Sequence, residues 1–353
     1  MADDDIYLGI DLGTSRTSIT CSTGFRETVW SYVGYAKDHV SKKMLGGREV
    51  IFGKEALDNR MSLDLHRPLE GGSIKVRDGK DTEQTKKAVK DLLGFVIGVA
   101  QIPTGSTIYC VIGAPAEASV EGKAAIIEAT SSFVDSVIVC SEPFAVAYGL
   151  DFLSDTLVID IGAGTTDQCR VHGTMPKPED QRTHRVGGDA VDNKLAELIS
   201  EHYPEAQFSI NMVREFKERS SSVSRNMDDV RVMLPVAGKP KEFDITELVY
   251  QACYTIVPPT VAALQDLIAT YDPEFQEKMR NNILLGGGGS QISGLGRAIE
   301  DALKEYGGGK VTTVEEPQYA GSNGALKIAL DMPKEHWTEF SPEQPAGTSA
   351  DVG

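Results

Sequence analysis

Two short segments of the chain place an aspartate at the end of an apolar strand, directly before a turn of small residues. The first reads IYLGIDLGTSRTSIT from Ile6, and the second reads TLVIDIGAGTTDQCRV from Thr156. Turns of this kind present backbone N–H groups and hydroxyls that bind an anion. An aspartate beside them repels phosphate but can hold a hydrated Mg²⁺ that bridges phosphate oxygens. Together the segments predict a clamp for a nucleotide polyphosphate with Mg²⁺.

The two segments match each other at an offset of 149 residues, so that Asp11 corresponds to Asp160 and Gly13 to Gly162. Either segment by itself is better explained as an ordinary β-turn in which the aspartate is a turn former. The matched pair instead favours two loops that face each other across a cleft. The candidate anion-binding residues are Gly13, Thr14 and Ser15 in the first loop, and Gly162, Ala163, Gly164 and Thr165 in the second.

A third glycine-rich loop lies within NILLGGGGSQISGL, Asn282–Leu295, between an expected strand and an expected helix. Glycines let the backbone approach a ligand closely, and a helix N-terminus favours an anion. No lysine follows the glycines as in a Walker A motif, and the Rossmann spacing is absent. After two matched hairpins, this loop is expected to complete the nucleotide site.

The composition is that of a soluble protein with material for two medium domains. The chain has 353 residues and a net charge of −17, a poor match to bare nucleic acid or anionic lipid. Its five cysteines show no metal or disulfide spacing, which favours reduced thiols in the cytoplasm. The acidic start differs from a signal peptide. The longest apolar run, Leu92–Ile102, is shorter than the roughly 20 residues that cross a membrane.

Strands and helices alternate along the chain, which predicts α/β layers around a mixed sheet. The pattern predicts a third strand at Val29–Tyr35, a long helix at Thr246–Tyr271 bent at Pro258-Pro259, and a closing helix at Gly321–Leu330. The second half repeats the first, so two similar lobes are expected to face each other across a cleft.

These motifs resemble the actin-like ATPase superfamily over nearly the whole chain. Besides the two hairpins and GGGGS at Gly286–Ser290, the sequence has SEPFAVAYG after Cys140 and GGD at Gly187–Asp189, in the family's order. The superfamily includes actin, DnaK-type chaperones, sugar kinases and MreB, and the resemblance is closest to the bacterial actin-like filament proteins of magnetosome chains. It implies an α/β, ribonuclease H-like duplicated fold with two lobes, four subdomains and a nucleotide cleft.

The resemblance also implies subdomain boundaries. They are 1–33, 79–150 and 321–340 for the core of lobe I (IA), 34–78 for its insertion (IB), 151–190 and 255–320 for the core of lobe II (IIA), 191–254 for its insertion (IIB), and 341–353 for a disordered tail.

Site residues carry over position by position. Asp11, Gly13, Thr14 and Ser15 match the first phosphate loop, and Asp160, Gly162, Gly164, Thr165 and Thr166 match the second. Glu142 matches the acid that positions the attacking water, Lys217 and Glu218 match the pair near the ribose and adenine, Gly188 matches the glycine on the γ-phosphate side, and Gly287 and Gly288 match those behind the base and α-phosphate. Asp11, Asp160 and Glu142 would hold Mg²⁺ through water.

Three of these assignments depend on the resemblance. Without it, Glu142 would be an acid favoured by a helix N-terminus, and Lys217 and Glu218 would be part of a solvated helix face. Four glycines also exceed the usual three, so the register of the Gly286–Gly289 loop stays open by one residue.

The implied function is that of an ATPase whose protomers assemble head to tail into cytoplasmic filaments that position organelles, specifically magnetosomes. The implied partners are other copies of the chain and organelle-associated adaptors. Direct DNA contact is not expected at this net charge, nor membrane insertion, because Met1–Asp5 is neither amphipathic nor apolar. The alternatives are a monomeric chaperone of the DnaK or ethanolamine-utilisation type, a sugar-type kinase, and a plasmid-segregating actin. The choice between ATP and GTP is left open.

Overall fold

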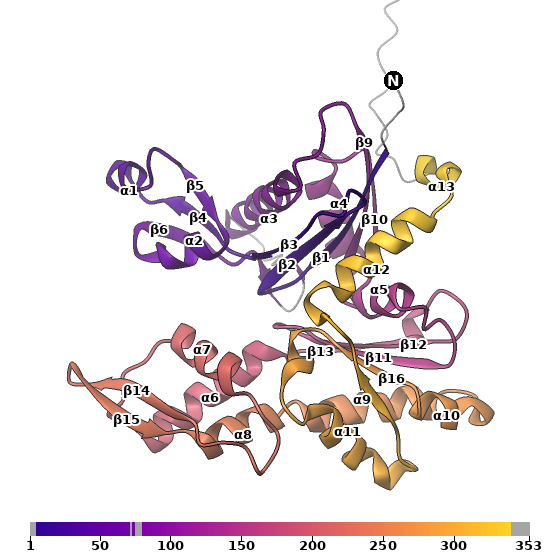
Figure 1. The fold of residues 1–353 in the computed structure, drawn as a ribbon. Coiled ribbons are helices and arrows are strands. Elements are labelled where there is room, and N and C mark those ends of the chain that lie inside the picture. The colour runs from indigo at the N-terminus through magenta and orange to yellow at the C-terminus, as the bar shows by residue number, and fades with distance from the viewer. Residues whose placement is uncertain (1–4, 71–72, 75–79, 340–353) are drawn as a thin grey trace, which may run out of the picture.

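The computed structural model describes residues 5–70, 73–74 and 80–339, which form two lobes that each contain a five-stranded sheet (Figure 1). The sheet of lobe I has the order β10-β9-β1-β2-β3. Its strands are β1 (Asp5–Leu12), β2 (Arg16–Cys21), β3 (Arg26–Trp30), β9 (Thr107–Ala114) and β10 (Ser136–Ser141). The sheet of lobe II has the order β17-β16-β11-β12-β13. Its strands are β11 (Thr156–Ile161), β12 (Thr166–Val171), β13 (Gln181–His184), β16 (Ile283–Gly286) and β17 (Val311–Thr313).

The two sheets have the same topology, because the repeated hairpin occupies the same place in each. In β1–β2 the last pair is Leu12 with Thr17, and in β11–β12 it is Ile161 with Thr166, again 149 residues later. β1 pairs in parallel with β9, just as β11 pairs in parallel with β16. The sequence repeat is therefore a structural duplication.

Two helices connect the lobes, because each follows a strand of one lobe and packs against the sheet of the other. Helix α5 (Glu142–Gly149) follows β10 of lobe I but packs against β11 and β12. Helix α12 (Pro317–Asp331) follows β17 of lobe II but packs against β1 and β9. The two helices lie side by side where the lobes meet (Figure 1). A Cβ atom on Gly324 would lie 1.8 Å from the carbonyl oxygen of Ala145, so the backbones are in direct contact.

Smaller elements complete each lobe. In lobe I they are a three-stranded sheet of β4 (Val33–Ala36), β5 (Val50–Phe52) and β6 (Leu63–His66), with α1 (His39–Met44) and α2 (Gly53–Asp58), the short pair β7 (Leu69–Glu70) and β8 (Ser73–Ile74), and helices α3 (Lys80–Val99), α4 (Val120–Thr130) and α13 (Lys334–Glu339). In lobe II they are α6 (Gly188–His202), α7 (Ile210–Ser220), the hairpin β14 (Arg231–Val236) and β15 (Lys239–Asp244), and helices α8 (Thr246–Tyr254), α9 (Val257–Ala269), α10 (Pro273–Arg280) and α11 (Leu295–Leu303).

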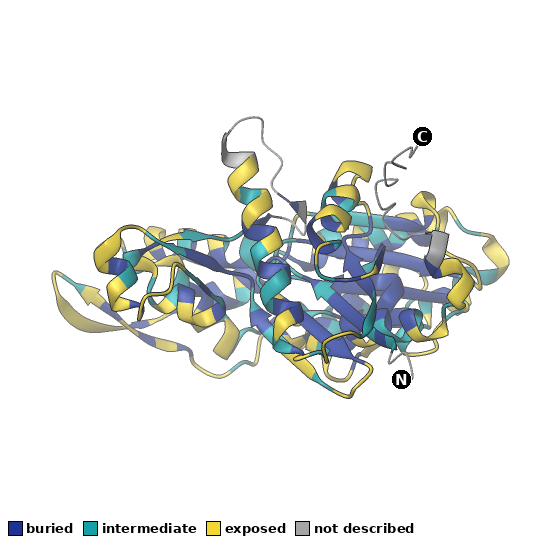
Figure 2. Ribbon diagram, turned by 90° about the horizontal axis from the view of Figure 1, so that it is seen from above, coloured by how far each residue is buried: buried dark blue, intermediate teal, exposed yellow. Residues whose placement is uncertain are grey.

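Each lobe has a hydrophobic core of its own between sheet and helices, and Figure 2 shows buried central strands with the exposed residues toward the periphery. The segment Thr246–Ala269 is long and apolar enough to cross a membrane by length and composition. Its apolar residues, among them Val249 and Leu264, belong instead to the core of lobe II. Burial in that core accounts for the apolar composition of the segment.

Two expected elements are each divided in the structure. The prediction of one strand at Val29–Tyr35 is wrong, because β3 ends at Trp30 and the chain enters a different sheet at Val33. The long helix expected at Thr246–Tyr271 is also two helices, with its break at 255–256 and not at Pro258-Pro259. Proline lacks an N–H donor and is favoured in a first helical turn, so α9 starts just before the prolines.

Two expected helix starts are also wrong. The closing helix starts at Pro317, four residues before the expected Gly321, again with proline in its first turn. The helix expected directly after the four glycines also starts later: a 3₁₀ turn (Gly288–Gln291) takes up the last two glycines, and α11 begins only at Leu295.

The contact between α5 and α12 generates a stability prediction. Gly324→Ala forces a Cβ atom into the backbone of α5, so we expect the free energy of unfolding to fall by about 3 kcal/mol. Gly98→Ala in α3 is the matched control, because a Cβ atom there meets nothing within 4 Å. Alanine in an open helix position should instead stabilise the protein by about 0.5–1 kcal/mol. Urea unfolding measures both, and equal effects would contradict the tight packing.

Candidate functional site

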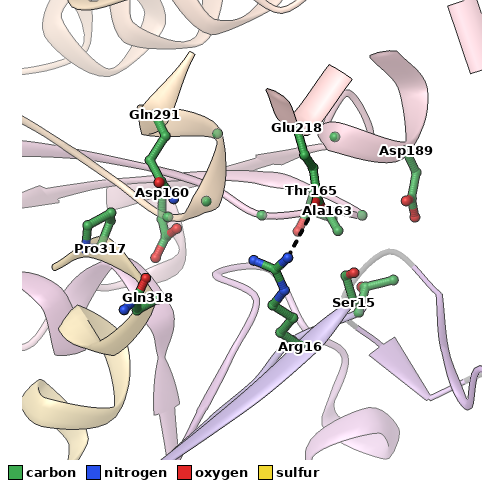
Figure 3. Close-up of a pocket in the computed structure, with 18 of the residues that line it drawn as sticks. Ser15, Arg16, Asp160, Ala163, Thr165, Asp189, Glu218, Gln291, Pro317 and Gln318 are labelled. Carbon is green, nitrogen blue, oxygen red and sulfur yellow. Dashed lines mark hydrogen bonds and ion pairs between the residues drawn. The ribbon is translucent and has the colours of Figure 1, made fainter. Parts of the chain in front are cut away.

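A cavity of about 380 Å³ lies between the two lobes, lined by the turns that the sequence singles out (Figure 3). The sequence-predicted residues that line it are Asp11, Gly13, Thr14, Ser15, Glu142, Asp160, Gly162, Ala163, Gly164, Thr165, Gly188, Lys217, Glu218, Gly287 and Gly288. They come from both sheets and their hairpin turns, from α5, α6 and α7, and from the loop after β16. The fold thus brings together segments up to 277 residues apart, from Asp11 to Gly288.

The two hairpin turns supply facing walls of the cavity. In the second turn, the N–H of Gly162 donates to the carbonyl of Thr165 (2.9 Å), which closes the loop. The start of α6 braces this loop from behind, because the N–H of Gly188 donates to the carbonyl of Gly162 (3.0 Å). Lys217 on α7 donates to the carbonyl of Gly188 (3.0 Å) and pairs with the buried Asp192 (2.7 Å). The second loop is therefore held by two helices of lobe II.

The third loop has a resolved register. Gly286 is the last residue of β16 and pairs with Asp160, while Gly287, Gly288 and Gly289 line the cavity. Gly287 has a φ of 72°, and a Cβ atom there would lie 2.2 Å from a carboxylate oxygen of Asp160. Only glycine therefore fits at 287, whereas Gly288 faces open space.

Thr166 differs from its expected place in the second phosphate loop, because it does not line the cavity. It is the first residue of β12, and it is fully buried. Its hydroxyl donates to the carbonyl of Val186 at 2.8 Å. This side chain holds the segment before α6, so the part of this turn that lines the cavity ends at Thr165.

Three carboxyl groups line the cavity, those of Asp11, Glu142 and Asp160, and the charge of Asp167 acts on all three. Burial raises the pKa of Asp11 to about 6, with a further contribution from the charge of Asp167. Burial also raises the pKa of Glu142 and of Asp160 well above their ordinary values, and the neighbouring acids, Asp11 foremost, add to both shifts. When these carboxyl groups are ionised, the surrounding protein groups therefore do not neutralise their negative charge.

The site fits a cation that is bound through water. One carboxylate oxygen of Glu142 is buried and accepts no hydrogen bond from the residues that the structure describes. Within the described residues, no three His, Cys, Asp or Glu side chains lie close enough to ligate a metal directly. Mg²⁺ keeps several waters and binds through one or two carboxylates with substrate phosphates, which agrees with this sparse set of acids.

Contacts between side chains also join the lobes across the cavity. Arg16 of lobe I pairs with Glu218 of lobe II at 3.2 Å (Figure 3), and its guanidinium lies 4.6 Å from the ring centre of Trp30. Arg214 of α7 donates to the hydroxyl of Tyr32 at 2.9 Å. Glu218, expected beside the ribose, is thus also positioned by lobe I.

Sequence reasoning missed several of these residues. Asp167 is the last residue of the GAGTTD motif, so the motif itself could have pointed to it. Its carboxylate accepts hydrogen bonds from the N–H of Ala116 (2.8 Å) and the hydroxyl of Thr183 (2.6 Å). Arg16 likewise stands inside the first motif. Arg214 lines the cavity without any local pattern that marks it, and only the tertiary fold could reveal it.

Comparison with known proteins agrees with this architecture. The model of the MreB/Mbl protein family matches residues 5–336. The chain belongs to the MreB/Mbl family. An actin-like protein MamK from Paramagnetospirillum magneticum is 38% identical to this MreB/Mbl protein over 339 residues, with 96% of each chain covered.

Solved structures of MamK are similar to it as well. A MamK double helical filament has a TM-score of 0.89 at 38% identity, covering 93% of this chain and 100% of the other. A non-polymerising MamK mutant bound to AMPPNP has a TM-score of 0.71 at 37% identity, covering 94% and 100%. The resemblance to actin-like proteins and the expected duplicated α/β fold are confirmed. The subdomain boundaries stay a prediction, and the tail at 341–353 lies outside the described residues.

The carboxyl cluster gives this MreB/Mbl protein a pH-dependent stability. Because folding raises the pKa of Asp11 to about 6, ionising this group costs the folded state free energy that accumulates from about pH 4 to 6. Without nucleotide or Mg²⁺, Asp11→Asn should raise the free energy of unfolding at pH 7.5 by about 1–2 kcal/mol. This gain should vanish below about pH 3, where the aspartic acid is neutral in both the folded and the unfolded state.

Urea unfolding in EDTA at several pH values measures this difference. Asp228→Asn is the control, since this exposed aspartate lies outside the cluster and its loss removes one negative charge at the surface. A variant at Asp11 that is less stable than wild type at pH 7.5 would show that the cluster is compensated after all.

Proposed function

We propose that this protein binds Mg²⁺–ATP in the cavity between its lobes, hydrolyses it, and assembles into cytoplasmic filaments. The observation that carries the proposal is the pair of duplicated turns that face one cavity, with an unpartnered carboxylate oxygen of Glu142 at its floor. Two loops of small residues suit a chain of phosphates. An AMPPNP-bound MamK mutant among the similar structures supports the choice of an adenine nucleotide.

The cavity-lining residues take these roles. The loops at Gly13–Ser15 and Gly162–Thr165 bind the phosphates through backbone N–H groups and hydroxyls. Lys217 and Glu218 bind the ribose and the base, Gly188 lies on the γ-phosphate side, and Gly287 and Gly288 back the base and the α-phosphate. Thr166 has no place in this scheme, because its hydroxyl is already bonded to Val186.

Glu142 is the proposed general base. It is the first residue of α5, and the parallel pairing of β10 with β9 places it in the lining of the cavity. Asp11 and Asp160 are the carboxylates that would hold Mg²⁺ through water, and the ion would supply positive charge that neutralises phosphate. As a carboxylate, Glu142 can orient a water molecule in the cavity and accept its proton. The raised pKa of the free Glu142 makes it a stronger base once deprotonated.

Filament formation is supported by the solved MamK filament that this chain resembles. A head-to-tail contact that repeats without closing produces an open filament. Closure of the lobes around ATP favours that contact, and hydrolysis weakens it. By the same relationship, the filament organises magnetosomes in a chain and binds adaptors on their surface, with no direct contact to DNA or insertion into the membrane.

The role of Glu142 generates the test of this function. Wild type should sediment as filaments with Mg²⁺–ATP and release phosphate. Glu142→Ala should sediment but release phosphate about 10²–10⁴-fold more slowly, because the general base is lost. Glu142→Gln, which keeps the shape but not the charge, should behave like the alanine variant.

Glu128→Ala removes an exposed carboxylate from α4 and is the matched control, with turnover like wild type. Phosphate release without any sedimentation, over a range of salt and protein concentrations, would contradict filament formation and favour a monomeric chaperone-type ATPase. Unchanged hydrolysis by both Glu142 variants would exclude the general-base role.

A further inference from the structure

Arg67 connects the first phosphate loop to lobe II although it lies in neither. It follows β6 of the small three-stranded sheet and precedes Pro68. Its Nε donates to the carbonyl oxygen of Thr14 at 2.9 Å. Its two terminal nitrogens pair with the two carboxylate oxygens of Asp189, at 2.8 and 3.0 Å. One guanidinium therefore holds a backbone oxygen of lobe I and a carboxylate of lobe II at once.

Asp189 is in turn bonded to the second phosphate loop. It lies in the first turn of α6, and its N–H donates to the carbonyl of Ala163 at 2.7 Å. Its carboxylate also lies 3.4 Å from Arg214 of α7, which places it between two arginines. The path from Thr14 through Arg67 and Asp189 to Ala163 thus joins the two phosphate loops by consecutive short contacts.

The geometry of this connection is specific to arginine. The fork pairs with both oxygens of Asp189 while Nε remains available for Thr14, an arrangement that a lysine ammonium cannot reproduce. The side chains of Arg67 and Asp189 are 22% and 27% exposed, so solvent screens the pair less than a surface ion pair. Arg67 does not itself line the cavity, whereas Thr14 and Asp189 do. Any effect it has on a ligand passes through the loops.

We propose that Arg67 is a positioning residue that sets the separation of the two phosphate loops. The loops grip a triphosphate from opposite sides, so their spacing decides how well both sides bind it. Because Arg67 follows a strand of the small sheet β5-β4-β6, triphosphate binding is linked to the position of that sheet. This inference rests on the proposed binding of ATP in the cavity.

The test compares AMPPNP and ADP binding, with Mg²⁺, at protein concentrations where nothing sediments. In Arg67→Ala, AMPPNP should bind about 10- to 100-fold more weakly than to wild type, because one loop is displaced. The affinity for ADP, which has one phosphate fewer to span the loops, should fall less than about threefold relative to wild type. Arg67→Lys should recover only part of the AMPPNP affinity, since it cannot keep all three contacts.

Asp189→Ala should show the same selective loss of AMPPNP affinity. The double variant Arg67→Ala/Asp189→Ala should bind AMPPNP no more weakly than the weaker-binding single variant, because both changes break one connection. Arg60→Ala removes an exposed arginine of the same subdomain, which contacts only the carbonyl of Leu57 among the described residues, and should bind like wild type.

The outcomes separate this inference from the proposed function. If wild type binds neither nucleotide, the proposed function fails and the role of Arg67 fails with it. If wild type binds both nucleotides and Arg67→Ala binds each of them as tightly as wild type does, only the inference is overturned. An equal loss for both nucleotides, with a lower melting temperature, would assign Arg67 a purely structural role and would also overturn it.

Discussion

The direct backbone contact between α5 and α12 is the constraint on which the rest of the structure depends. Each helix follows the sheet of one lobe and packs on the sheet of the other, so both lobes are built around this pair. Gly324 lets the backbones touch. Glu142 at the start of α5 and Pro317 at the start of α12 both line the cavity, so the same packing also fixes its floor. The packing of α5 on α12 therefore determines both how the lobes are joined and where these cavity residues lie.

The carboxyl cluster shows how binding and stability oppose each other in this protein. Asp11, Glu142 and Asp160 all have raised pKa values because they are removed from water and lie near one another. A protein selected for stability alone would carry neutral groups there. In the proposed function, a cation bound to the ionised carboxylates would offset this cost to the folded state.

The sequence contained most of the local information about the site, and little of the long-range information. The offset between Asp11 and Asp160 predicted the duplicated hairpins because strand, turn and register are encoded within a few residues. The break before α9 was missed because bent and divided helices share one apolar pattern. Thr166 was misplaced because a hydroxyl's direction depends on what packs beside it. Arg67 and Arg214 act on segments more than 50 and 180 residues away, at Thr14 and Tyr32, and no spacing rule reaches that far.

The position of α12 also orders events during synthesis. A Cβ atom on Gly9 would lie 2.1 Å from the carbonyl oxygen of Ser322, so the first strand of lobe I is covered by a helix near the other end of the chain. A ribosome must therefore add more than 300 residues before lobe I can bury its central sheet. Lobe II, whose sheet and helices lie closer together in the chain, can be nearly complete by then. Such distant pairing slows folding and leaves the face of β1 that carries Gly9 uncovered until α12 has been made.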